Sequence, residues 1–254
     1  MILRFCAATA IAVGAACLTS PTAIAAGTDA RVPFQVGEAL TYDVSFSNFV
    51  TAGRATMRVT DRKTLGAGRT GYGLQVEAQS LSVAASLYKL YYKIESVLDT
   101  TSLASVRSVS YSNEGGRERV KSISFGPNNT ADVETRTKQS VRRKLTLPAH
   151  TLDMLSAIYV IRALAVRPGE SLTMPIVDGE SISRVRLTFG SKEVVSTSVG
   201  KLPGWKVTLA VLDERGSAAH AQRWALWLSD DAARKPLRFD AALPVGAITL
   251  TLAK

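Results

Sequence analysis

The chain has 254 residues, of which 46% are hydrophobic and 20% charged, and its formal net charge is +10 at pH 7. This balance is typical of a globular protein with a substantial core. It excludes a disordered tail, a collagen-like fibre and a polytopic membrane protein, but it identifies no substrate.

Residues 1–25 have the layout of a secretory signal peptide. Arg4 supplies a positive charge, an apolar run extends from Phe5 to Leu18, and the small-residue box Ala23-Ile24-Ala25 follows. The run is shorter than the roughly 20 residues that a membrane-spanning helix needs. We therefore expect cleavage near Ala25 and a periplasmic or secreted mature protein.

Both cysteines, Cys6 and Cys17, precede the expected cleavage site. The mature protein is therefore predicted to have no thiol for a disulfide, a nucleophile or a metal ligand. Lipidation of Cys17 is the alternative. Gly14 disfavours it, because a bacterial lipobox normally has a bulky apolar residue three positions before its cysteine.

Cleavage would remove Arg4 and no acidic residue, leaving a net charge of +9. In an envelope such a basic protein would be attracted to lipid headgroups, lipopolysaccharide phosphates and wall polymers rather than to nucleic acid. The densest basic cluster, Arg142, Arg143 and Lys144, is the candidate contact with an anionic surface. The alternative is a solvated strand face that serves solubility.

Apolar and polar residues alternate with a period of two along most of the remaining chain. The clearest segments are residues 42–46, 55–60, 74–79, 184–189, 207–211 and 248–252. Such alternation indicates antiparallel sheet with one solvated face. We expect about 11–13 strands, which is too many for one flat sheet. The predicted fold is mainly β, with a curled antiparallel sheet or open half-barrel.

The segment from Thr151 to Ala165 has apolar residues at helical spacing instead, and Arg167-Pro168-Gly169 ends it. Thr151 is predicted to be the N-cap, with Asp153 in the first turn, where the helix dipole favours a carboxylate. A helix that is apolar on nearly every side must be buried, so we expect one buried helix near 151–165, against the concave face of the sheet. No linker divides the chain, and residues 26–254 are predicted to form a single domain.

Sequence signatures of catalysis are scarce. His150 and His220 have no partners at metal-binding spacing, and no G-x-S-x-G motif or phosphate-binding glycine loop occurs. We therefore expect no cofactor, no metal site and no enzymatic activity. Carboxylates such as Asp153 and Asp178 leave a hydrolase as a third hypothesis, which would require two of them to face each other across a cleft.

Aromatic and helix residues are candidates for the wall of an apolar groove, although core packing is the default explanation for such side chains. Trp224 and Trp227, three positions apart on a predicted strand, should point to opposite faces. The candidate groove comprises Tyr88, Tyr91, Tyr92, Leu155, Tyr159, Trp224 and Trp227.

Six short strings stand out along the chain, at 36–45 (VGEALTYDVS), 52–55 (AGRA), 153–159 (DMLSAIY), 227–231 (WLSDD), 234–238 (RKPLR) and 246–248 (GAI). In sequence and in order they resemble strings of the DUF3108 family of bacterial envelope proteins of unknown function. The chain departs from the family at Lys93-Ile94-Glu95, where members often have an Arg-Asp pair. The resemblance implies an envelope protein, all-β with a helix, and it provides no activity or site residue.

These observations lead to two main hypotheses. The first is a non-enzymatic envelope protein that binds or carries a lipid-like or other apolar ligand in a groove of the sheet, with the charged head of an anionic amphiphile on a basic rim. The alternative is a structural or interaction protein that docks on an envelope protein or the cell wall through an edge strand or the basic cluster. Neither involves nucleic acid, and any membrane association would be peripheral.

Overall fold

The computed structural model describes residues 29–46, 50–81, 85, 89–165, 167–213, 216, 218–243 and 246–254. The expected signal peptide with its two cysteines, and Tyr88, lie outside the described residues. Within these ranges, no helix is long and apolar enough to cross a membrane.

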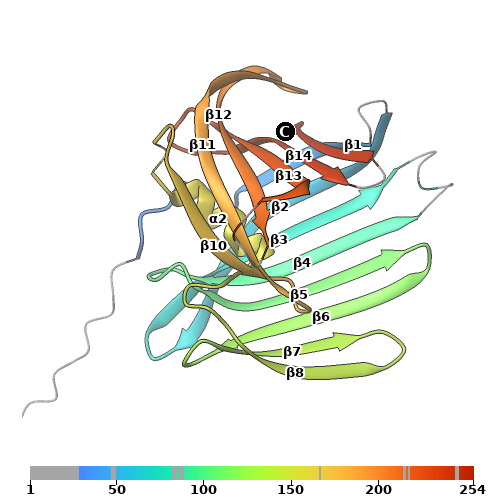
Figure 1. Ribbon diagram of the computed structural model, residues 1–254, viewed down its shortest axis with the longest axis vertical. Helices are drawn as coiled ribbons and strands as arrows, with labels where there is room; N and C mark the ends of the chain where they lie inside the picture. The colour runs from blue at the N-terminus through green and yellow to red at the C-terminus, as the bar shows by residue number, and fades with distance from the viewer. Residues whose placement is uncertain are drawn as a thin grey trace, which may run out of the picture.

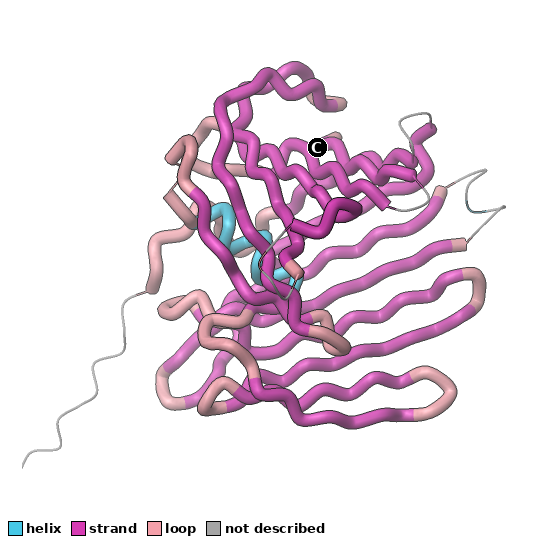
Figure 2. Tube along the Cα trace, viewed as in Figure 1, coloured by secondary structure: helices cyan, strands magenta, loops and turns pink. Residues whose placement is uncertain are grey.

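The described residues form one open sheet of fifteen strands in two arms (Figures 1 and 2). The first arm comprises β1 (Ala39–Phe46), β2 (Val50–Gly66), β3 (Arg69–Ser80), β4 (Leu90–Asp99), β5 (Ser105–Glu114), β6 (Arg117–Gly126), β7 (Thr130–Arg136) and β8 (Ser140–Thr146). The second comprises β9 (Leu152–Asp153), β10 (Ser171–Val177), β11 (Ile182–Thr197), β12 (Gly200–Leu212), β13 (Ala218–Ser229), β14 (Pro236–Leu243) and β15 (Gly246–Leu252).

Most strands pair antiparallel with their neighbours along the chain. The two arms are joined where β1 pairs antiparallel with β15, with Val44 opposite Leu250. At the far end of the second arm, the two-residue β9 pairs parallel with β10. Strands β8 and β9 are the two edges of the sheet, so it curls without closing.

The prediction of a mainly β fold with a curled antiparallel sheet is confirmed, with more strands than expected. The additional strands have weak sequence patterns. The sequence of β8, Ser140–Thr146, is exposed almost throughout and lacks an apolar face, and β9 is too short to show a period.

The predicted helix is confirmed as α2 (Met154–Ala163), which lies between the two arms and contacts β3, β4, β9 and β10 (Figure 1). Its N-cap is Asp153, whose carboxylate accepts hydrogen bonds from the backbone N–H groups of Leu155 and Ser156. The prediction of Thr151 as the cap was wrong. The chain remains extended through β9 before the helix begins, and the Thr151 hydroxyl donates instead to the carbonyl of Pro148.

The core consists of three clusters of buried side chains. Leu155 and Tyr159 of α2 pack with the inner faces of β1–β4, and Ile161 packs with β10–β13. The third cluster joins the free ends of the arms, where Ile123 of β6 and Val177 of β10 pack together. Side chains thus connect the two arms where no ladder of backbone hydrogen bonds does.

Candidate ligand-binding site

A hollow of about 320 Å³ lies on the inner side of the sheet, beside the start of α2 and the end of β10. The first arm contributes β4, β5 and β6. Its lining consists of Tyr92, Ile94, Ser108, Ser110, Ser112, Glu114, Arg119, Lys121, Ile123, Asp153, Met154, Val177 and Asp178.

Strand β5 gives the hollow a row of hydroxyl groups. Ser108, Ser110 and Ser112 occupy alternate positions and therefore point to the same face of the strand. Val109 and Tyr111, between them, line separate depressions on the opposite face. The wall of the hollow that β5 forms is therefore polar.

Apolar side chains form another part of the lining of the hollow. Ile123 and Val177 are buried, and Ile94 is half-buried against the main core. Met154, the first residue of α2, is 48% exposed and also lines the hollow. An apolar ligand would therefore find contacts from both the sheet and the helix.

Two cations contribute positive charge to the hollow. Lys121 Nζ lies 3.0 Å from a carboxylate oxygen of Glu180, and a guanidinium nitrogen of Arg119 lies 3.4 Å from the same oxygen. Glu180 lies in the turn between β10 and β11, so these ion pairs also link the two arms. The side chain of Lys121 is only 16% exposed, whereas that of Glu180 is about half exposed.

The carboxylate of Asp153, at the base of the hollow, is occupied by structural hydrogen bonds. The hydroxyls of Ser96 and Ser105 each donate to it at 2.7 Å, in addition to the two helix N–H groups. These contacts fix the start of α2 against β4 and the beginning of β5. Asp153 therefore holds the helix in place.

The structure distributes the predicted groove residues over several places. Only Tyr92 lines the hollow, where its hydroxyl donates to Glu114. Leu155 and Tyr159 are fully buried in the core. Tyr91 lies on the opposite face of β4, and its hydroxyl donates to Glu77 at 2.9 Å.

The two tryptophans of β13 lie in the second arm, away from the hollow. The cross-strand partners of Trp224 are Leu209 on β12 and Ala241 on β14, and those of Trp227 are Lys206 on β12 and Arg238 on β14. Trp227 is buried under these two cations, and its indole N–H donates to Glu193 at 2.9 Å.

Alternation along β8 divides the predicted basic cluster between two faces. Arg142 and Lys144 lie opposite Glu134 and Asp132 of β7, whereas Arg143 lies opposite Val133, whose side chain is buried. Arg142 is 3.6 Å from the carboxylate of Glu134. Part of the positive charge is therefore balanced locally.

Sequence reasoning did not identify most residues of the hollow. The alternation of serines from Ser108 to Ser112 was a readable signal of a polar inner face. Arg119 and Lys121 carried no such signal, because their role depends on the β10–β11 turn, which is distant in sequence and reaches β6 only in the folded protein.

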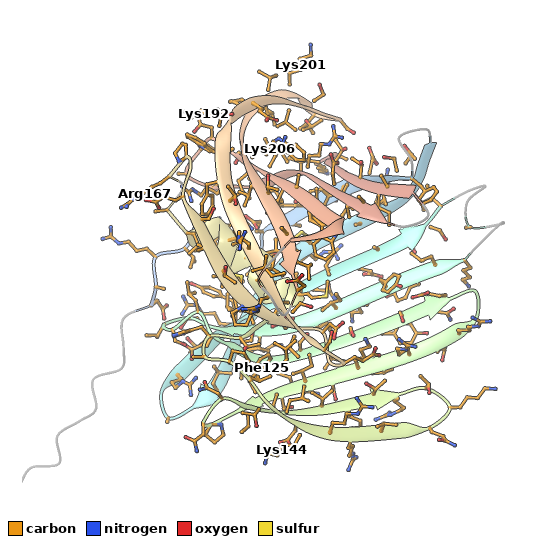
Figure 3. The ribbon with its side chains drawn as sticks, in the orientation of Figure 1. Phe125, Lys144, Arg167, Lys192, Lys201 and Lys206 are labelled. Carbon is orange, nitrogen blue, oxygen red and sulfur yellow. The ribbon has the colours of Figure 1, made fainter. Side chains whose placement is uncertain are left out.

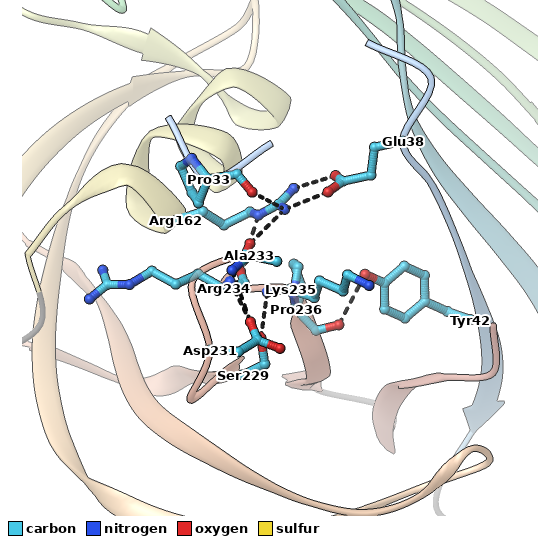
Figure 4. A network of polar contacts seen from close by, with 10 residues as sticks. All are labelled: Pro33, Glu38, Tyr42, Arg162, Ser229, Asp231, Ala233, Arg234, Lys235 and Pro236. Atoms are coloured by element: carbon cyan, nitrogen blue, oxygen red, sulfur yellow. Dashed lines mark hydrogen bonds and ion pairs between the residues drawn. The ribbon is translucent and has the colours of Figure 1, made fainter. Parts of the chain in front are cut away.

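A second polar cluster surrounds Arg162, which has no solvent exposure (Figure 4). Its guanidinium donates to both carboxylate oxygens of Glu38 at 2.7 and 2.8 Å, and to the carbonyls of Ala233 and Arg234. It also lies over the rings of Phe34 and Tyr159. The cluster joins the N-terminal segment, the helix and the β13–β14 loop, so we interpret it as structural.

Burial raises the pKa of two tyrosines near this cluster, Tyr42 and Tyr159. The Tyr42 hydroxyl donates to the carbonyl of Pro236 at 3.0 Å. Both phenols therefore remain neutral at physiological pH. In the part of the chain that the structure describes, no group of three His, Cys, Asp or Glu side chains could hold a metal ion.

Comparison with known proteins supports the fold and the family. Among solved structures, the chain resembles a beta-barrel-like protein of the domain of unknown function DUF1849 from Brucella abortus, with 10% identity, a TM-score of 0.55 and coverage of 85% of this chain and 95% of that one. A structure described as "a putative lipoprotein" from Parabacteroides distasonis has 11% identity, a TM-score of 0.35 and coverage of 89% and 99%.

The Brucella structure bears on the fold alone, because its sequence identity is so low. A search of curated proteins finds no match. The sequence profile of the family described as "Protein of unknown function (DUF3108)" matches residues 41–253, and the chain therefore belongs to the DUF3108 family.

Proposed function

We propose that this protein is a non-enzymatic envelope protein that binds an amphiphile with an anionic head group in the hollow beside α2. The observation that carries the proposal is that apolar side chains, hydroxyl groups and the two cations Arg119 and Lys121 all face this one hollow. Such a combination suits a ligand that is apolar at one end and negatively charged at the other. The three carboxylates in the lining of the hollow already accept hydrogen bonds: Glu114 from Tyr92, Asp153 from the start of α2, and Asp178 from its own turn.

The size of the hollow limits the ligand. Its volume of about 320 Å³ is at the lower end of the ~300–1,000 Å³ typical of ligand pockets. A single acyl chain or a small ring system fits this range better than a diacyl lipid. The apolar part would lie against Ile94, Ile123 and Met154.

The anionic head group of the ligand would displace the Glu180 carboxylate from its ion pairs. Glu180 already pairs with Arg119 and Lys121, so a ligand carboxylate or phosphate would compete for the same cations. Charge-assisted hydrogen bonds of this type are roughly twice as strong as neutral ones, and they would favour an anionic ligand over a neutral one of equal size.

The experiment is native mass spectrometry of the mature protein, delipidated and then incubated with lipid extract from its own membranes. We expect an added mass in the lipid range for the wild type and for Val109→Trp, whose new ring lies on the outer face. Ser110→Trp should lose it, because the ring fills the hollow. No uptake by the wild type, or equal uptake by both variants, would rule out a ligand in this hollow.

Two further variants test the head group. Lys121→Met should weaken binding of a fatty-acid probe about tenfold, the effect of losing ~1.4 kcal/mol. Glu180→Gln should strengthen it, because the amide competes less well for the cations. If Glu180→Gln weakened binding as Lys121→Met does, the head group would not lie at these cations.

A second candidate function is docking on an envelope partner through the edge strand β8. Its observation is that Arg142 and Lys144 project from an edge strand that is exposed along most of its length. Charge reversal of Arg142, Arg143 and Lys144 should then abolish co-purification of a partner, whereas unchanged co-purification would count against this surface.

N-terminal sequencing of the mature protein tests the proposed cleavage near Ala25.

A further inference from the structure

The distal part of the β11–β12 hairpin extends over the second arm as a curved ribbon (Figure 1). Its turn is held in place at Ser198, whose backbone N–H donates to the Leu252 carbonyl at 3.0 Å and whose hydroxyl donates to Asp43 at 2.8 Å. The hairpin therefore has a fixed outer surface.

This outer surface exposes large apolar side chains. Val194 is 73% exposed and Val199, in the turn, is 50% exposed. The adjacent Val195 is 4% exposed and packs into the main core, which explains an apolar residue on the inner side of the hairpin. Core packing within the described chain does not explain the exposed valines on the outer side.

The register places further residues of the hairpin on the same face. Val194 lies opposite Pro203, and Lys192 lies opposite Trp205. Because cross-strand partners and alternate residues share a face, Val194, Pro203 and Trp205 form an apolar patch, and the Ser196–Lys201 pair separates this patch from Val199 in the turn. We call this surface the hairpin face; it comprises Lys192, Val194, Val199, Lys201, Pro203 and Trp205.

Two lysines, Lys192 and Lys201, flank the apolar patch, and both are labelled in Figure 3. The Lys192 ammonium lies 4.8 Å from the centre of the Trp205 ring and 2.7 Å from a carboxylate oxygen of Asp230. Lys201 is exposed near the turn, opposite Ser196. The apolar patch therefore has a lysine on each side, although the charge of Lys192 is balanced by Asp230, whose carboxylate also accepts a hydrogen bond from the Trp205 indole N–H at 2.7 Å.

We propose that the hairpin face docks the protein on an anionic lipid bilayer. Valines would enter the boundary of the acyl chains, the indole of Trp205 would lie at the level of the head groups, and the lysines would contact lipid phosphates. A protein partner fits less well, because six residues are far fewer than the roughly 20–30 per side of a stable protein interface.

This inference is independent of the hollow. The hairpin face belongs to the second arm, whereas the sheet strands around the cations of the hollow, β4–β6, belong to the first. The two proposals can therefore fail separately.

The test is co-sedimentation of the mature protein with vesicles of phosphatidylethanolamine and phosphatidylglycerol, compared with vesicles of phosphatidylcholine alone. The wild type should bind the anionic vesicles, with binding reduced by high salt. Val194→Glu and Val199→Glu should each lower the partition coefficient about tenfold or more. The matched control is Val36→Glu, which changes a valine before β1 that is 44% exposed and should leave binding unchanged.

Lysine reversals and fluorescence complete the test. Lys201→Glu should weaken binding, and Lys63→Glu, at an exposed lysine of β2, should not. Brominated lipid should quench tryptophan emission of the wild type and quench Trp205→Phe less. Circular dichroism should show each variant folded. The proposal would be overturned if the wild type did not bind the vesicles, or if all variants bound them equally. It would also be overturned if the protein captured a protein partner, in a way that requires Val194, in place of vesicles.

Discussion

A single buried side chain, Arg162, holds together three segments that are far apart in the sequence. Its charge is balanced by Glu38 and its remaining donors by backbone carbonyls. Removing one member of such a pair is costly, because it leaves the other charge buried without compensation.

We therefore expect Glu38→Gln to lower the free energy of unfolding by about 3 kcal/mol, measured by urea denaturation. Glu170→Gln is the control, because its pair with Arg167 is exposed on both sides. That substitution should cost less than about 0.5 kcal/mol. Equal effects would show that the buried pair contributes no more than a surface one.

Asp99 makes stability depend on pH. Burial alone would raise the pKa of its carboxyl, but the backbone N–H of Ser102, the Arg69 guanidinium and the N–H of Thr101 outweigh burial and hold the pKa below its ordinary 3.8. A carboxyl with a lowered pKa stabilises the folded state above its unfolded pKa, and this stabilisation is lost as the pH falls through the folded value.

Asp99→Asn should accordingly destabilise the protein by about 2 kcal/mol at pH 7. Urea denaturation should show this difference shrinking as the pH is lowered through and below the ordinary pKa of 3.8. Asp132→Asn, at an exposed position of β7, should have little effect at any pH. A constant difference across pH would contradict the role of the charged carboxylate.

At the scale of the elements, the start of α2 is held by one polar residue, Asp153. Asp153→Ala would remove the N-cap, worth about 1 kcal/mol, and would leave the hydroxyls of Ser96 and Ser105 without their acceptor. We expect a total loss of about 3 kcal/mol in thermal or urea unfolding. Thr151→Ala, at the residue that the sequence suggested as the cap, should cost less than about 1 kcal/mol. A larger loss of stability for Thr151→Ala than for Asp153→Ala would instead support Thr151 as the N-cap, as the sequence suggested.

The sequence predicted elements better than the contacts between them. Alternation identified strands such as Val185–Phe189 and the helical spacing located α2, because both patterns depend on local geometry. The N-cap was misplaced because β9 depends on pairing with β10, which the local sequence does not show. The hollow was missed for the same reason, since Lys121 and Glu180 meet only when the arms curl together.

On the scale of the whole molecule, the sheet is weakest at its free edges. The strands β1, β2 and β15 are paired on both sides and cover the main core, whereas β8 is paired on one side only. Native-state hydrogen exchange should therefore show β8 amides exchanging at least about tenfold faster than those of β1 and β15. Uniform protection would mean that the sheet opens only as one unit.

The pairing of β1 with β15 also has a consequence for biosynthesis. Phe46 ends β1 and Gly246 begins β15, a separation of roughly 200 residues, which a ribosome covers in about 10–40 s at ~5–20 residues per second. Throughout this interval one edge of β1 has no partner in the nascent chain. A chain that ended before β15 would keep that edge open permanently, and open strand edges pair with other chains.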